Sequence, residues 1–424
     1  MSVIVATHQR RALVLETLES LAEQDVPDGC FEVIVSADSC TDGTAEAIRD
    51  HADRWPMPVR VVEHSGANAS TTRNTGARAA VGDWLVFIDD DIRPLPGFLA
   101  AHLAARREGS VNIGYSKPRA TLDDDRYHRE AWAWWEDTFV RVLGEDGHRF
   151  TYMDFLSGNF GLSAALFAEL DGFDETFTLA WEDHEFGLRL IEREVRLAYL
   201  PEAVGSHAYG TDLAAALARR RQEGKAAVRF GRAHPQFRYS LFAGFVNGGM
   251  GRRLRLIVRI AESRGRGERI ATSLGRFGGS TRASWRHRRT LASGIARDLR
   301  YWQGVLDEIG SAKALGSWLQ DAPLPPTITP ATPSIEMGRL LAIDPDTPVD
   351  DVVKGADKLG VRVLYGGTQL LGFAADPGAE RLRVLHVAAT AQRLLHERFF
   401  EGDPKAQGVL ATSRVCPERK ESVA

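Results

Sequence analysis

Apolar runs and amphipathic stretches alternate along the first two hundred residues of the chain. The stretches 13–21 and 70–80 carry a spacing that predicts helices. Short apolar runs separate them and predict buried strands, at 3–6, 31–37, 59–62 and 84–88. Strands and helices that alternate in this way favour an α/β layer with a largely parallel sheet.

Two acidic turns directly follow predicted strands. The segment from Asp38 to Thr44 follows the second strand, and Asp89, Asp90 and Asp91 follow the fourth. In open α/β sheets, ligands bind at the carboxyl ends of the strands. We therefore expect the two acidic turns to share one crevice.

The alternation continues, with less regular spacing, to about residue 235. An aromatic-rich helix is expected at 131–142, a small-residue segment at 157–163 and a further helix at 182–194. Two short strands or extended segments, 195–200 and 203–209, are expected to close this compact domain.

Four parts are expected along the 424 residues, a length that suits one large domain and a smaller one. Five prolines between Pro323 and Pro333 indicate a stiff, extended linker. The tail from Lys405 is expected to be frayed. The expected parts are an α/β domain at 1–235, a basic and mainly helical extension at 236–322, the linker at 323–334, and a small α/β module of unknown role at 335–424.

Charge is distributed unevenly, although the formal net charge is only −4. Between Thr211 and Gln303 the chain has 21 Lys or Arg and 5 Asp or Glu. Such a segment suits an anionic membrane surface, where each basic side chain contributes roughly 1 kcal/mol. Clustered arginine also attracts nucleic-acid phosphates, but a recognised reading motif is absent, so no specific nucleic acid is expected. A third interpretation pairs the arginines with the acidic domain across an internal interface.

Cysteine usage and the lengths of apolar runs bear on the compartment. Cys30, Cys40 and Cys416 show no Cys-x-x-Cys spacing, so neither a disulfide framework nor a cysteine zinc site is suggested. The chain opens on a strand-like run without a basic leader. No apolar stretch reaches the roughly 18 residues that a membrane span requires. We expect a cytoplasmic protein, soluble or peripheral at the inner face of the cell membrane.

Three sets of residues are candidates for chemistry, and each has a plain structural alternative. Three consecutive carboxylates after a strand repel one another unless a divalent cation offsets their charge; otherwise they form a solvated turn or a helix cap. Glu182 and Asp183 stand at a helix start, where carboxylates are favoured by the helix dipole and also serve as caps. His207 is either a structural histidine or a metal ligand.

The ordered combination of motifs is more specific than any one of them. In chain order the motifs are Thr7, 38–44, Arg73-Asn74-x-Gly76, 87–91, Gly158-Asn159 and Trp181-Glu182-Asp183. With these motifs, residues 2–235 resemble family 2 glycosyltransferases of the GT-A fold, an α/β fold with a mixed, Rossmann-like sheet flanked by helices. The stretch 170–175 is similar to the segment that precedes the catalytic helix in that family.

The resemblance implies a donor site for a nucleotide-diphosphate sugar. Asp38 would contact the base or the ribose, and Asp89 and Asp91 would form the Asp-x-Asp motif. Asp91 would bind a Mn²⁺ or Mg²⁺ ion, and Asp89 the ribose, or the metal through water. The other implied residues of the nucleotide-sugar site are Thr7, Arg73, Asp90 and Asn159. Arg73 would stabilise charge on the leaving diphosphate, or alternatively pair with surface carboxylates.

The resemblance also implies a catalytic carboxylate. In the galactofuranosyltransferase branch, a histidine 24 residues after the base aspartate completes the metal site, and His207 lies 24 residues after Asp183. Asp183 would then be the general base, with Glu182 as the competing assignment. Such a base takes the proton of the attacking hydroxyl, so the displacement is direct and inverts the configuration.

The expected function is metal-dependent, inverting transfer of a sugar to an acceptor hydroxyl. Cell-envelope polysaccharide or a lipid-linked glycan is the favoured acceptor, with a glycosylated natural product as the alternative. The Gln-x-x-Arg-Trp motif of processive synthases is absent, so a non-processive enzyme is expected. The cluster of Trp132, Trp134 and Trp135 is either an acceptor platform or core packing. Self-association into a homo-oligomer is a further candidate property.

Two other classes of protein stay open. Nucleotidyltransferases share the nucleotide-binding fold, but their glycine-rich signature with a lysine is absent after the first strand, at 7–11. A non-catalytic binding or membrane-scaffold module is expected to lose one acidic motif, and this chain keeps both. In the C-terminal module, Gly366 and Gly367 end a strand, and a hairpin turn is favoured there over a phosphate-binding loop.

Overall fold

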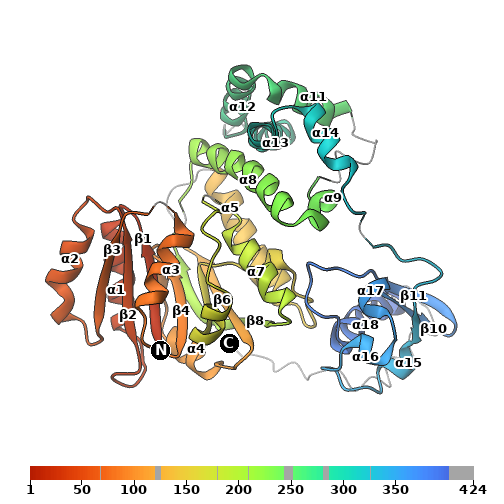
Figure 1. The fold of residues 1–424 in the computed structure, drawn as a ribbon, viewed down its shortest axis with the longest axis horizontal. Helices are drawn as coiled ribbons and strands as arrows, with labels where there is room; N and C mark the ends of the chain where they lie inside the picture. Colours follow the sequence, from red (N-terminus) through yellow and green to blue (C-terminus); the bar gives the residue numbers. More distant parts are fainter. Residues whose placement is uncertain are drawn as a thin grey trace. The chain divides into compact units, whose positions relative to one another are not determined.

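A computed structural model describes residues 1–66, 68–119, 126–178, 180–208, 210–242, 252–279, 286–324 and 326–400. The chain forms two compact units (Figure 1). Of the described residues, the first unit holds those in 1–143 and 152–324, and the second holds those in 144–151 and 326–400. The chain therefore contributes to the second unit twice, through a short internal segment and again at its end.

One eight-stranded sheet forms the base of the first unit, in the order β3-β2-β1-β4-β7-β6-β8-β5. Neighbours among β3, β2, β1 and β4 are parallel, whereas β7 is antiparallel to β4 and β6, and β5 is antiparallel to β8. The strands are β1 (Ser2–Thr7), β2 (Glu32–Asp38), β3 (Val59–His64), β4 (Trp84–Asp89), β5 (Ile92–Pro94), β6 (Ser110–Pro118), β7 (Asn159–Ser163) and β8 (Arg196–His207). The predicted mixed α/β fold is confirmed.

Helices flank this sheet, as Figure 1 shows. α3 begins where the Asn68 side chain accepts a hydrogen bond from the Thr71 amide at 2.8 Å. Gly76 lets α3 approach β1, because a Cβ there would overlap the Ile4 side chain. The helices are α1 (Arg11–Ala22), α2 (Thr44–His51), α3 (Ala69–Ala79), α4 (Phe98–Ala104), α5 (Arg126–Glu136), α6 (Ala164–Glu169), α7 (Glu182–Glu192) and α8 (Leu213–Ala233), with a π-helical turn at Asp137–Val142 and a 3₁₀ turn at Tyr152–Asp154.

A cluster of phenylalanines fixes α7 against the centre of the sheet. Phe87 of β4 stacks on Phe160 of β7 with ring centroids 4.6 Å apart, and Phe173 stacks on Phe186 of α7 at the same separation. All four side chains are buried. Each contributes roughly 1.5–3 kcal/mol through removal of its apolar surface from water. The start of α7 is thereby held close to the carboxyl end of β4.

Two predicted elements differ from those observed. The segments 195–200 and 203–209 were predicted as separate short strands, but β8 is one strand whose pairing with β6 slips between Leu200 and Val204. This irregularity accommodates Pro201, which has no amide hydrogen for the ladder. Tyr209 lies outside the described residues. The aromatic-rich helix begins earlier than predicted, at Arg126, and ends in the π-helical turn.

The basic segment forms further helices within the first unit. They share a core with α8, which includes Leu299, Trp302 and Val305. α8 and α13 approach closely at two glycines, because a Cβ on Gly224 would overlap the Tyr301 carbonyl and one on Gly304 would overlap the Arg221 carbonyl. These helices are α9 (Arg238–Leu241), α11 (Arg252–Glu262), α12 (Arg264–Gly279), α13 (Arg286–Ile309) and α14 (Ala312–Gln320). Among the described helices, none has both the length and the apolar character needed to span a bilayer.

The second unit contains a small sheet in the order β11-β10-β9. Gly366 and Gly367 have positive φ angles of 56° and 76°, and they connect β10 to the antiparallel β11. A two-residue connection of this kind is a hairpin turn, so the predicted hairpin is confirmed. The elements are β9 (Ser334–Glu336), β10 (Val361–Tyr365), β11 (Thr368–Phe373), α15 (Met337–Leu340), α16 (Val349–Val352), α17 (Ala356–Leu359) and α18 (Val384–Phe400). The predicted frayed tail from Lys405 lies outside the described residues.

The internal segment 144–151 is bonded into this second unit. The Phe150 amide donates to Glu380 Oε1 at 3.2 Å, and Thr151 forms an isolated bridge with Ala379. The same Glu380 carboxylate is buried and also contacts His386 at 3.2 Å. Burial opposes the charge of Glu380, but the hydrogen bond and charge of His386 outweigh it and lower the pKa of Glu380. No pattern in the sequence predicts this arrangement.

Candidate active site

A cleft of about 590 Å³ opens at the carboxyl ends of β1, β2 and β4. Both acidic turns reach it, so the predicted shared crevice is present. Its volume lies within the range of small-molecule sites. The lining residues are Ala6, Thr7, His8, Arg10, Asp38, Ser39, Asn68, Ala69, Thr72, Arg73, Asp89, Asp90, Thr178 and Glu182.

Arg73 joins the strand end to the start of α7. One of its terminal nitrogens, Nη2, donates to Asp89 Oδ1 at 2.8 Å, and the other, Nη1, donates to Glu182 Oε1 at 3.2 Å. Its side chain is only 7% exposed and lies against the Phe173 ring. Burial opposes the charge of Arg73, but Asp89 and Glu182 outweigh it and raise the pKa of Arg73. The cleft therefore has a fixed positive charge between two carboxylates.

Asp90 lines the cleft, but its side chain is only 5% exposed. Its Oδ2 accepts a hydrogen bond from the Thr7 hydroxyl at 2.7 Å, and its Oδ1 accepts one from Arg10 Nη1 at 2.9 Å. Burial raises the pKa of Asp90 to about 6, although Arg10 and Thr7 oppose this effect. Among the three consecutive carboxylates, Asp90 thus connects the turn after β4 to Thr7 and Arg10, and its role is structural.

Asp91 lies beside His207, the last residue of β8. The distance from His207 Nε2 to Asp91 Oδ1 is 3.3 Å, and Asp91 Oδ2 accepts a hydrogen bond from Arg10 at 3.1 Å. Burial works against the charge of Asp91, but His207 and Arg10 outweigh it and lower the pKa of this carboxyl. The Trp135 ring packs edge-on against His207 with centroids 4.9 Å apart. The structure thus brings together two residues that are more than one hundred positions apart in the chain.

The chemistry of this pair fits a divalent cation in part. Carboxylate oxygen and imidazole nitrogen are ligands for Mn²⁺ and related ions, and Mg²⁺ is commonly held by one or two carboxylates together with substrate phosphates and water. Asp89, the third predicted ligand, is bonded to Arg73 instead. Among the described residues, no group of three or more His, Cys, Asp or Glu side chains is arranged to hold a metal ion. A metal here would complete its coordination with ligands from the substrate.

Glu182 and Asp183 occupy the first turn of α7 but have different surroundings. Burial and the neighbouring Asp183 raise the pKa of Glu182, while Arg73 opposes the shift. Asp183 Oδ1 accepts a hydrogen bond from the His184 amide at 2.8 Å, and its side chain is 23% exposed. The preceding residue, Trp181, has a φ of 70°, a strained value for a bulky side chain. This backbone conformation directly precedes the first residue of α7 and so determines the position of Glu182 and Asp183.

The remaining predicted donor-site residues separate into two locations. Asp38 lies at the cleft, where its Oδ1 accepts hydrogen bonds from the Gly66 amide and the Ser39 hydroxyl, both at 3.0 Å. Asn159 is buried in the sheet, donating to the Ala203 carbonyl at 2.9 Å and lying 3.0 Å from His102 Nε2. Asn159 does not line the cleft.

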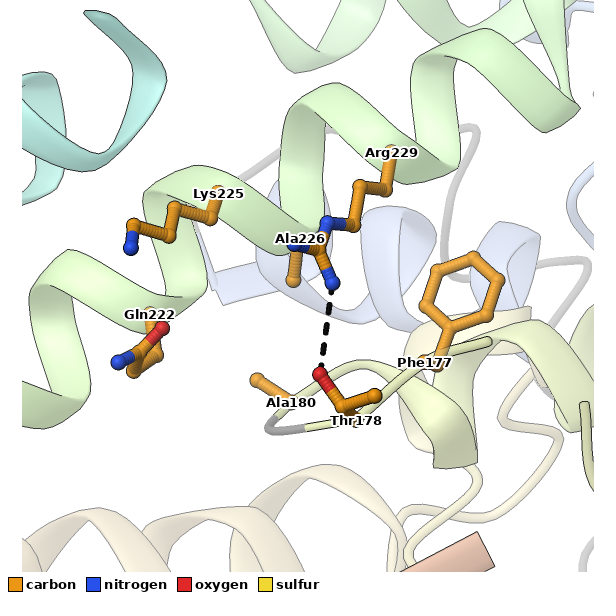
Figure 2. Close-up of a pocket in the computed structure, with 7 residues that line it drawn as sticks. All are labelled: Phe177, Thr178, Ala180, Gln222, Lys225, Ala226 and Arg229. Atoms are coloured by element: carbon orange, nitrogen blue, oxygen red, sulfur yellow. Dashed lines mark hydrogen bonds between the residues drawn. The ribbon is translucent and has the colours of Figure 1, made fainter. Parts of the chain in front are cut away.

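Sequence reasoning missed two contributors to the site. Arg10 contacts both Asp90 and Asp91, and the basic residue after an apolar strand is the only sequence signal for it. Arg229 of α8 donates to the Thr178 hydroxyl at 3.4 Å (Figure 2). The same guanidinium pairs with Glu308 at 3.0 Å. Because Thr178 lines the cleft, this contact connects the helices of the basic segment to the loop before α7.

The tryptophans predicted as an acceptor platform do not share one environment. Trp135 packs on Phe139 and His207, with nearly parallel rings 5.6 Å apart in the first pair. Trp132 and Trp134 are 39% and 52% exposed. Trp135 therefore has a packing role beside the cleft, and the two others present apolar surface to solvent.

Comparison with known proteins gives a family model, curated relatives and solved structures that resemble this chain. Residues 2–170 match the model of the family described as glycosyl transferase family 2. A validoxylamine A glucosyltransferase from Streptomyces hygroscopicus subsp. limoneus is 31% identical over 239 residues, which cover 49% of this chain and 51% of that protein. A GalNAc(5)-diNAcBac-PP-undecaprenol β-1,3-glucosyltransferase from Campylobacter jejuni is 30% identical over 116 residues, covering 27% and 36% of the two chains.

The chain spans about half the length of the first of these relatives. Among solved structures, a mannosyltransferase from Pyrobaculum calidifontis in complex with GDP-Man and Mn²⁺ is 20% identical. That likeness covers 76% of this chain and 87% of the other, with a TM-score of 0.44.

Proposed function

We propose that this chain, whose residues 2–170 match the model of glycosyl transferase family 2, belongs to that family and transfers a sugar from a nucleotide diphosphate to an acceptor hydroxyl. The observation that carries the proposal is the cleft at the ends of β1, β2 and β4. It gathers Asp38, Asp89, Arg73 and Glu182 around one space that suits a nucleotide-diphosphate sugar. The transfer is direct and inverts the configuration.

On the donor side, each residue has a role that its contacts support. Asp38 accepts hydrogen bonds from the base or the ribose. Arg73 keeps a fixed positive charge at the cleft, where negative charge develops on the departing diphosphate. A preorganised charge of this kind stabilises the transition state more than a mobile one, because it needs no reorganisation during the reaction.

We assign a Mn²⁺ or Mg²⁺ ion to Asp91 and His207, with Asp89 nearby. When bound, the ion neutralises charge on the diphosphate leaving group. The 3.3 Å separation of Asp91 Oδ1 and His207 Nε2 supports this assignment. Trp135 packs against the His207 ring and restricts its orientation.

Asp183 is the proposed general base. Glu182 is held by Arg73, and to serve as a base it would have to give up that ion pair. Asp183 is partly exposed at the helix start, where it accepts a proton from the acceptor hydroxyl as that oxygen attacks the sugar. Glu182 then positions Arg73.

The test is calorimetric binding of UDP, GDP and dTDP, each with and without Mn²⁺, to the wild type and to Asp91→Ala. We expect one nucleotide to bind in a metal-dependent manner, and the variant to lose that dependence. Nucleotide binding that is indifferent to Mn²⁺ would remove the metal assignment but keep the donor site. If none of the three binds under either condition, the donor-site assignment is wrong.

We further propose that the acceptor is a cell-envelope or lipid-linked glycan, reached from the cytoplasmic face of the membrane. Within the described part of the chain, five arginines of α11 and α12 are exposed and form no ion pair: Arg255, Arg259, Arg266, Arg269 and Arg276. These charges are available to anionic headgroups. One relative is named for an undecaprenol-linked acceptor, and another for a small natural product, which is the alternative acceptor class.

A further inference from the structure

Two arginines line the cleft, and they are held in different ways. Arg73 is enclosed, and each of its two terminal nitrogens has its own carboxylate. Arg10 is half exposed, and its Nη1 atom alone serves both Asp90 Oδ1 at 2.9 Å and Asp91 Oδ2 at 3.1 Å. Because water can replace the contacts of an exposed guanidinium, Arg10 leaves its partners at a lower cost than Arg73 would.

Arg10 also stands where a metal ion would compete with it. Of the two Asp91 oxygens, Oδ1 faces His207 and Oδ2 accepts the Arg10 hydrogen bond. A divalent cation held between Asp91 Oδ1 and His207 would bring its charge next to the guanidinium on Oδ2 and repel it, and bidentate binding to Asp91 would also take Oδ2 itself. Asp90 does not depend on Arg10 alone, since the Thr7 hydroxyl bonds its other oxygen. Asp90 therefore keeps its hydrogen bond from Thr7 when the guanidinium is displaced.

We propose that Arg10 is an exchangeable counter-ion, which neutralises Asp90 and Asp91 before the donor binds and moves to the donor diphosphate when a metal ion takes Asp91. This inference rests on the proposed function. Guanidinium suits the second position because its planar fork donates two parallel hydrogen bonds to phosphate oxygens. Its place at the cleft lining puts the side chain beside the space for the diphosphate.

The exchange couples the two ligands. A metal ion that binds alone must displace Arg10 from Asp91 without giving it a new partner. When the nucleotide diphosphate is present, the displaced guanidinium gains phosphate oxygens. Each ligand therefore increases the affinity of the other, and by the same factor in both directions.

The experiment compares the wild type with Arg10→Gln in two binding measurements. Binding of Mn²⁺ alone is followed by the electron paramagnetic resonance signal of the free ion. Nucleotide binding is followed by calorimetry at saturating Mn²⁺, with UDP, GDP and dTDP as probes. We expect Arg10→Gln to bind Mn²⁺ alone about tenfold more tightly, and to bind the nucleotide about tenfold more weakly. A merely structural role for Arg10 would weaken both.

Two further variants control this comparison. Arg11→Gln removes the same charge one position later; its side chain is exposed and has no ion pair within the described part of the chain, so both affinities should stay unchanged. Arg10→Lys keeps the charge without the fork, and should keep the weak Mn²⁺ binding of the wild type while losing part of the nucleotide affinity.

Unchanged or weaker Mn²⁺ binding by Arg10→Gln overturns the proposal. So does an unchanged nucleotide affinity in a wild type that binds nucleotide. Failure of the proposed function is visible separately, because it appears as a wild type that binds none of the three nucleotides. In that case a gain in Mn²⁺ affinity by Arg10→Gln would still support the counter-ion role, and no gain would refute it.

Discussion

Two neighbouring carboxylates in the first turn of α7 differ in what holds them. Glu182 is bonded to Arg73, while Asp183 accepts a hydrogen bond from the His184 amide of its own helix. A carboxylate that is not committed to an arginine can take up a proton without breaking an ion pair. This difference favours Asp183 as the proton acceptor and Glu182 as the residue that positions the Arg73 charge.

We expect Asp183→Asn to lower kcat by about 10²- to 10⁴-fold, because the general base is lost. Nucleotide affinity should not change, and calorimetry would measure it beside the kinetics. Glu192→Gln, at the exposed far end of the same helix, is the matched control and should have normal kcat. A normal kcat for Asp183→Asn, together with an inactive Glu182→Gln enzyme, would show that Glu182 is the general base and Asp183 is not.

A buried histidine gives the stability a pH dependence. Burial lowers the pKa of His102 to about 4, and its hydrogen bond with Asn159 only partly opposes this. The unfolded chain therefore takes up the His102 proton first as the pH falls, so stability is lost between about pH 6.5 and pH 4. Through this group, urea unfolding should show roughly 2 kcal/mol less stability at pH 5 than at pH 7.

His102→Gln tests this assignment. Glutamine can donate a hydrogen bond to Asn159 but does not titrate, so the variant should lose that part of the pH dependence whatever its stability at pH 7. A variant that destabilises with falling pH as strongly as the wild type would exclude His102 as the source.

At the level of single residues, the sequence indicated which side chains are candidates for the site, but not which hydrogen bonds and ion pairs they form. Asp38, Asp89 and Glu182 were predicted from their positions at strand ends and a helix start, where topology dictates the location. Arg10 was missed because a long side chain reaches its partners across space that no spacing rule describes. Asn159 was assigned to the donor, but its amide is bonded within the sheet.

At the level of elements, the contact between α8 and α13 depends on two glycines. Gly224→Ala should destabilise the first unit by about 1–3 kcal/mol, because the added methyl would overlap the Tyr301 carbonyl. Gly294→Ala on α13 is the matched control: nothing lies near its Cβ position, so it should be neutral or stabilising by about 0.5–1 kcal/mol. Urea unfolding measures both, and equal effects would show that the helices can separate at no cost.

The predicted strands and helices of the parallel half were close to those observed, because buried parallel strands give uninterrupted apolar runs. The antiparallel half was harder. β6 was not predicted, since Asn112, Gly114 and Lys117 interrupt its apolar pattern. β8 was predicted as two strands separated near Pro201, because the sequence does not distinguish a strand end from a register shift that accommodates a proline.

At the level of the whole molecule, the exposed arginines predict how the protein meets a membrane. The wild type should sediment with vesicles of anionic phosphatidylglycerol, and less so at high salt. The pair Arg255→Gln and Arg259→Gln should weaken binding by roughly 30-fold, at about 1 kcal/mol for each charge. Arg54→Gln with Arg107→Gln removes the same charge elsewhere in the first unit and is the control. An equal loss of vesicle binding in the two double variants would show that binding depends only on the net charge of the protein.

The double contribution of the chain to the second unit sets an order for its assembly during synthesis. Residues 144–151 leave the ribosome first, and their partners from residue 326 onward follow 175 residues later. At about 5–20 residues per second, Glu380 is synthesised roughly 12 to 46 s after Phe150. The second unit can therefore close only after translation of the first is complete, and the nascent chain must keep this short segment accessible until then.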